Sequence, residues 1–117
     1  VMTAEDAALC VDHKVHSVYI SNHGGRQLDH VLGNIETLPE IMAAVNGKAE
    51  VVIDGGFVRG TDIVKALALG AKAVGIGRLQ AWALGAGGTE ALVACLENLR
   101  TELITTMGQR PPRHRRG

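Results

Sequence analysis

Apolar residues in the first half of the chain alternate between helical spacing and short continuous runs. Residues 3–12 place apolar side chains and alanines at helical spacing, and they start at Thr3, whose hydroxyl can cap a helix. Residues 15–20 form a strand-like apolar run, and residues 34–45 carry an apolar stripe at helical spacing. The pattern therefore predicts a helix, a strand and a second helix over these three ranges.

The second half continues the same alternation. Apolar runs at 50–53 and 73–76 predict two further strands, and helical spacing predicts helices over 61–69 and from about 89 to 107. Gly70 follows the third predicted helix at the position where a left-handed residue commonly ends a helix. Continuous apolar strands separated by helices are typical of a parallel sheet covered on both faces, so the sequence predicts an α/β fold.

Three strands make a small sheet, and both of its edges would stay open to mispairing. The chain also starts on a predicted helix that no strand precedes. We therefore expect about three βα units that are part of a larger barrel. We expect residues 1–108 to form this barrel portion and residues 109–117 to form a basic, disordered tail.

The composition indicates a folded protein without a nucleic-acid-binding face. Hydrophobic residues make up 46% of the 117 residues and aromatic residues only 3%, so the core must consist of Ala, Val, Leu and Ile. The formal charge of +0 hides an asymmetry, because four of the 12 basic residues are arginines in the last eight positions. The remaining chain is mildly acidic, which excludes an extended basic surface. For the tail, a nucleic-acid or membrane arm is the less favoured interpretation.

The two cysteines lie far apart in apolar helical patterns, which predicts free thiols in a reducing compartment rather than a disulfide. Neither the cysteines nor the histidines have the spacing of a metal site. No apolar run reaches the length of about 18 residues that a membrane-spanning helix needs. We expect a cytoplasmic protein that has no membrane segment and does not bind nucleic acid.

The most informative motif is Ser-Asn-His-Gly-Gly-Arg-Gln at residues 21–27, directly after the first predicted strand. Imidazole gains and loses a proton near neutral pH, so His23 can act as a general base. Arg26 carries a planar guanidinium that binds a carboxylate through two parallel hydrogen bonds. The two glycines between them let the chain turn so that both side chains face one ligand. This setting favours a catalytic role for His23 over a structural one.

A second motif, Asp54-Gly55-Gly56, ends the second predicted strand and precedes a helix. Glycines before a helix N-terminus expose backbone N–H groups that suit a phosphate, and Asp54 can accept hydrogen bonds from ligand hydroxyls such as those of a ribityl chain. Gly77 and Arg78 add a glycine turn with a positive charge after the third strand. The sequence therefore predicts a phosphate site where the strands end. The alternative is that Asp54 and Arg78 only pair with each other.

Together these motifs resemble the FMN-dependent α-hydroxy-acid oxidases and dehydrogenases, which include glycolate oxidase, lactate oxidase and dehydrogenase, mandelate dehydrogenase and flavocytochrome b2. The resemblance rests on residues 21–29, 54–71 and 77–78, in the family's order and spacing, and covers nearly all of residues 1–107. It implies the C-terminal third of a (β/α)8 TIM barrel, with strands six to eight. It also implies FMN as cofactor, oxidation of a small L-2-hydroxy acid to a 2-oxo acid, and a homotetramer for intact relatives.

The resemblance further implies roles for individual residues. His23 would remove a proton from the 2-hydroxy acid, Arg26 would bind its carboxylate, and Ser21 would lie near the flavin. The ribityl and phosphate groups of FMN would be held by Asp54, Gly55, Gly56, Phe57, Val58, Gly77 and Arg78.

The chain departs from the family pattern at three points. Val58 stands where the family usually has an arginine that helps to hold the phosphate. Leu79-Gln80 stands where the family typically has proline, and the pattern gives way to an Arg/Pro-rich run after Gly108. The family's flavin-binding lysine, its substrate-binding tyrosines and its base-orienting carboxylate lie on earlier strands, so we expect the isolated chain to be inactive. A catalytically silent barrel fragment and another phosphate-binding barrel enzyme, such as an isomerase, are the alternatives.

Overall fold

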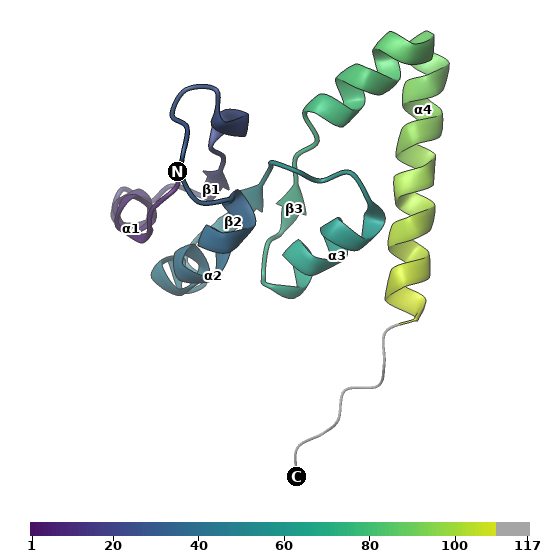
Figure 1. The fold of residues 1–117 in the computed structure, drawn as a ribbon. Helices are drawn as coiled ribbons and strands as arrows, with labels where there is room; N and C mark the ends of the chain where they lie inside the picture. Colours follow the sequence, from purple (N-terminus) through teal and green to yellow (C-terminus); the bar gives the residue numbers. More distant parts are fainter. Residues whose placement is uncertain (110–117) are drawn as a thin grey trace.

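The computed structural model describes residues 1–109, which form a three-stranded parallel sheet and four α-helices (Figure 1). The elements in chain order are α1 (Ala4–Asp12), β1 (Ser17–Ile20), the short 3₁₀ helix η1 (His23–Gly25), α2 (Asn34–Val45), β2 (Glu50–Ile53), α3 (Gly60–Ala68), β3 (Ala73–Val74) and α4 (Arg78–Gly108). This order confirms the predicted alternation of helices and strands. The tail expected over 109–117 lies outside the described residues from position 110 onward.

The strands pair in parallel in the order β1–β2–β3, with Ile20 beside Ile53 and Ile53 beside Val74. Alternate residues of β1 and β2 point to the helix-covered face, where they are at most 1% exposed. The core cluster on this face consists of Ala7, Val18, Ile20, Leu38, Ile41, Val45, Val51, Ile53, Phe57, Ala66 and Ala71. It is therefore the aliphatic core that the composition predicts, with Phe57 as its one aromatic member.

Capping explains where the first two helices begin. The Oγ1 of Thr3 accepts a hydrogen bond from the backbone N–H of Asp6 at 3.2 Å, which confirms Thr3 as the cap of α1. In α2, the carboxylate of Glu36 accepts from the backbone N–H of Gly33 at 2.7 Å. Gly70 follows α3 with a φ of 109°, a conformation that favours glycine.

The predicted helix over about 89–107 corresponds to the second arm of α4, whereas the first arm was not predicted. α4 begins at Arg78 rather than near residue 89, and its axis breaks at Gly87 and Gly88, where the backbone is not helical. Figure 1 shows the resulting elbow between the two arms of α4. Six of the eight residues at 79–86 are alanine, leucine or glutamine, which favour a helix, although the surrounding glycines obscure this pattern.

The first and third strands are shorter than predicted. β1 begins at Ser17 rather than at residue 15, and β3 ends at Val74 rather than at residue 76. β3 pairs only with the last two residues of β2, Val52 and Ile53, so the ladder stops where β2 ends. Among residues 1–109, no helix combines the length and the apolar character that a membrane crossing needs.

The second arm of α4 is fixed to the start of α3. A Cβ on Gly60 would overlap the α4 backbone at Glu102 and Leu103, so this contact requires glycine. The carboxylate of Glu102 accepts from the backbone N–H of Gly60 at 2.7 Å and from Nε of Arg59 at 2.8 Å. The hydrogen bond from Arg59 and, next, that from Gly60 lower the pKa of the Glu102 carboxyl below its ordinary value of 4.5.

This pKa shift predicts a pH-dependent contribution to stability. Because the folded state lowers the pKa of Glu102, the stabilisation is complete above the ordinary value of 4.5 and is lost as the pH falls through the folded value. We expect Glu102→Gln to lower the unfolding temperature at neutral pH, with a difference from the wild type that shrinks below pH 4.5. Thermal unfolding across this range measures it, and a difference that is constant with pH would contradict the account.

Candidate functional site

The loops after β1, β2 and β3 meet at one edge of the sheet, because parallel strands end on the same side. They enclose a cavity of about 530 Å³, which lies within the range of small-molecule sites. The predicted site residues that line it are His23, Arg26, Asp54, Gly55, Gly56, Phe57, Val58, Gly77 and Arg78. Of the predicted set, Ser21 alone does not line the cavity, and it contacts Asp54 instead.

His23 lies in η1 with a left-handed backbone, at a φ of 54°. A residue other than glycine in this region carries about 1–2 kcal/mol of strain. Two hydrogen bonds between residues close in sequence hold the turn. The backbone N–H of His23 donates to Oγ of Ser21 at 3.1 Å, and that of Gly24 donates to the side-chain oxygen of Asn22 at 2.9 Å. Gly24 and Gly25 continue the left-handed turn at φ values of 66° and 74°, which explains the glycine pair.

The carboxylate of Asp54 joins the ends of β1 and β2. Its Oδ2 accepts a hydrogen bond from Oγ of Ser21 at 3.0 Å, and its Oδ1 accepts from Nδ2 of Asn34 at 3.0 Å. A carboxylate has about four acceptor positions, so this group retains capacity for ligand hydroxyls. Asp54 therefore has a structural role in addition to the predicted ligand-binding one.

Arg78 reaches from the start of α4 toward the loop that carries His23. Its Nη2 lies 3.6 Å from the position that a Cβ on Gly24 would occupy. Within residues 1–109 the salt bridges involve Arg59, Lys65, Lys72 and Arg100, and Arg78 makes none. The alternative in which Asp54 and Arg78 only pair with each other is therefore wrong, and the guanidinium is available to an anion.

The helix N-termini beside the cavity differ in their free N–H groups. At the start of α3, Oδ2 of Asp62 accepts from the backbone N–H of Val58 at 3.2 Å and of Arg59 at 3.0 Å. At the start of α4, no side chain caps the helix at Gly77. Because a helix N-terminus with unsatisfied N–H groups attracts anions, the N-terminus of α4 suits a phosphate better than that of α3.

Tyr19 lies on the face of the sheet opposite the core. A Cβ on Gly75 would overlap the phenol oxygen of Tyr19 and would lie 3.2 Å from Cβ of Asp54. Desolvation, followed by the negative charge of Asp54 and a hydrogen bond to it, raises the pKa of Tyr19 above its ordinary value of 10.0. The missing side chain at Gly75 is therefore what admits this phenol.

Sequence reasoning missed two residues of the site. Asn34 is 4% exposed and bonds to both the His23 loop and Asp54, yet its place at the start of a helix suggested no more than a helix boundary. Trp82, which was not among the predicted site residues, is 61% exposed and lines the cavity. The helix that carries Trp82 was not predicted, so the direction of this side chain could not be inferred.

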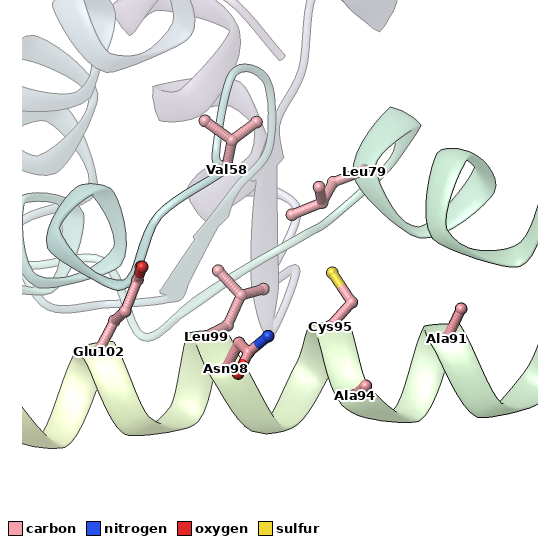
Figure 2. Close-up of a pocket in the computed structure, with 8 residues that line it drawn as sticks. All are labelled: Val58, Leu79, Ala91, Ala94, Cys95, Asn98, Leu99 and Glu102. Carbon is pink, nitrogen blue, oxygen red and sulfur yellow. The ribbon is translucent and has the colours of Figure 1, made fainter. Parts of the chain in front are cut away.

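A second cavity, of about 320 Å³, lies behind Val58 and Leu79, which line both cavities. Its other wall comes from α4 and consists of Ala91, Ala94, Cys95, Asn98, Leu99 and Glu102 (Figure 2). Figure 2 shows the sulfur of Cys95 pointing from α4 toward Leu79. This lining is mostly apolar, so the residues able to bind charged groups concentrate in the first cavity.

Comparisons with known proteins agree with this geometry. An L-lactate oxidase from Nostoc sp. is 50% identical to this chain over 107 residues, which make up 92% of this chain and 29% of that protein. 2-Hydroxyacid oxidase 2 from Bos taurus is also 50% identical, over 92% of this chain and 30% of its own length. A solved structure of mandelate oxidase with (S)-2-phenylpropionate is 47% identical with a TM-score of 0.90, over 92% of this chain and 32% of that one.

The chain thus spans less than a third of the length of each of these proteins. Its three parallel βα units correspond to part of the TIM barrel of these oxidases, which confirms the predicted fold class. Residues 1–110 match the family described as FMN-dependent dehydrogenase, which is the family that the motifs at 21–29, 54–71 and 77–78 suggested. The chain belongs to the FMN-dependent dehydrogenase family.

Proposed function

We propose that this chain contributes the base and the FMN-phosphate end of the active site of an oxidase of small L-2-hydroxy acids, which yields 2-oxo acids. The observation that carries the proposal is that the strained His23, Arg26, Asp54 and Arg78 all line one cavity. Relatives named as an L-lactate oxidase, a 2-hydroxyacid oxidase and a mandelate oxidase support this class of substrate.

His23 in η1 and Arg26 directly after η1 act on the substrate. The guanidinium of Arg26 binds the substrate carboxylate through two parallel hydrogen bonds, which orients the hydroxyl-bearing carbon. The imidazole of His23 accepts a proton from the substrate as that carbon is oxidised. The left-handed backbone of His23 supports this role, because strain in folded proteins is concentrated at functional sites. Bound FMN would accept the two electrons that the substrate loses.

The loops after β2 and β3 fit the other end of FMN. The carboxylate of Asp54 accepts hydrogen bonds from ribityl hydroxyls, and the left-handed glycines after it, at φ values of 89° and 79°, let the backbone approach the ligand. Arg78 and the uncapped N-terminus of α4 hold the phosphate. Phe57 is 7% exposed and Val58 is apolar, so these two residues shape the loop rather than supply charge.

We also propose a cytoplasmic location and, for the whole protein, a homotetramer. Cys10 and Cys95 are both free thiols, which supports a reducing compartment such as the cytoplasm. A homotetramer for the whole protein rests on the resemblance to the family.

The assignment of the base predicts the effect of His23→Gln in a flavin-loaded full-length enzyme that contains this chain. Glutamine cannot take up the substrate proton, so we expect the rate of flavin reduction by L-lactate or glycolate to fall by about 10²–10⁴-fold while FMN remains bound. Anaerobic stopped-flow absorbance measures the rate. His16→Gln is the matched control, because His16 is exposed and does not line the cavity. An unchanged reduction rate in His23→Gln would exclude His23 as the base.

The backbone strain at His23 predicts that two inactive variants at this position differ in stability. Glycine accepts the left-handed conformation that alanine resists, and both substitutions remove the imidazole. We therefore expect His23→Gly to be more stable than His23→Ala by about 1 kcal/mol, although both are inactive. Urea denaturation gives the difference. If His23→Ala is as stable as His23→Gly, the turn is not strained as described.

A further inference from the structure

We propose that Asn34 is a positioning residue that fixes the loop bearing His23 to the loop bearing Asp54. Its consequence for catalysis rests on the proposed function, whereas the coupling between the two loops rests on hydrogen bonds alone.

The buried amide of Asn34 bonds to both loops at once. Its Oδ1 accepts from the backbone N–H of Asn22 at 3.2 Å, in the loop after β1. Its Nδ2 donates to the backbone oxygen of Asp54 at 2.8 Å and to the Asp54 carboxylate at 3.0 Å, in the loop after β2. An amide has both a donor and an acceptor, and Asn34 directs one to each loop. A side chain of this size that can only donate or only accept hydrogen bonds cannot make both connections.

The surroundings of Asn34 match this amide closely. A Cβ on Gly55 would lie 2.6 Å from Nδ2 of Asn34, so a larger residue at position 55 would displace the amide. On the other side, Oγ1 of Thr37 donates to the backbone oxygen of Asn34 at 3.0 Å and anchors the residue in the first turn of α2. Asn34 is therefore held by α2 while it holds the two loops.

The link to His23 runs through a single residue. Asn22, whose N–H bonds to Asn34, directly precedes the left-handed His23. Without this anchor the turn can relax toward a right-handed backbone, which would move the imidazole relative to Asp54. Loss of the Asn34 amide should therefore disturb proton transfer and FMN binding together, although Asn34 does not line the cavity.

The decisive variant is Asn34→Asp, which keeps the shape and the acceptor but replaces the donor. At about pH 8 the new carboxylate repels that of Asp54, whereas at about pH 5 a shared proton restores a donor. We expect FMN affinity to be about tenfold weaker than in the wild type at the higher pH and to recover toward it at the lower pH. Tyr19 stays protonated throughout because its pKa is raised from 10.0. His23 and Arg78 also line the cavity, so the wild type is measured at both pH values as the reference.

Two further variants serve as a matched control and as a substitution that does not ionise. Thr37→Val removes a buried hydrogen bond from the same turn of α2 but touches neither loop, so its FMN affinity should follow the wild type at both pH values. Asn34→Ser cannot span both loops and does not ionise, so it should bind FMN weakly at both pH values. It also serves as the test if Asn34→Asp does not fold.

Amide NMR of the same proteins separates the coupling from the proposed function. We expect the ¹H–¹⁵N signals of Asn22, His23 and Gly55 to move in Asn34→Asp and Asn34→Ser, and to remain in place in Thr37→Val. If no variant or wild type binds FMN while these signals move, the proposed function fails and the coupling stands. If the substitutions at Asn34 move only signals of α2, the coupling is wrong.

Discussion

The carboxylate of Asp54 is the constraint on which the site depends. The backbone N–H of Asp54 donates to the backbone oxygen of Ile20 at 3.1 Å, so the ladder between β1 and β2 continues into the loops. Its carboxylate then accepts from Ser21 in the loop after β1 and from Asn34 at the start of α2. A buried or partly buried carboxylate needs such donors, and here they come from the segments that must be aligned. The same group that ties the loops together keeps acceptor positions for a ligand.

Stability and chemistry are separated in this fold. The helix-covered face of the sheet holds the aliphatic core, and the junction of α3 and α4 is fixed by Glu102 and Gly60, away from His23. The edge of the sheet carries the left-handed His23, whose backbone is strained, and Arg78, which makes no salt bridge within residues 1–109. This arrangement is expected where rigid elements support loops that perform the chemistry.

Much of this organisation is visible in the sequence because it follows from short-range patterns. The core stripe of α2, the Thr3 cap and the glycine turns are local, and the predicted site residues lie together because all of them follow strands of one parallel sheet. The roles proposed for His23 and Arg26 rest on their chemistry and on the resemblance to the family.

What the sequence could not show depends on contacts between distant segments. Asn34 joins residues 12 and 20 positions away through its side chain, and no periodicity records such bonds. The N–H of Val58 is taken by Asp62, which is why the proposed phosphate site lies at the start of α4 rather than of α3. The first arm of α4 was missed because glycines on both sides hide a short helix-forming segment.

The central claim is that the loops after β2 and β3 hold the ribityl and phosphate groups of FMN. A titration of the ¹⁵N-labelled protein with FMN, followed by amide NMR, tests it most directly. The account predicts the largest shifts at Gly55, Gly56, Gly77 and Arg78, with little change on the outer faces of α1 and α2. Shifts that spare these four amides while FMN binds elsewhere on the chain would contradict it.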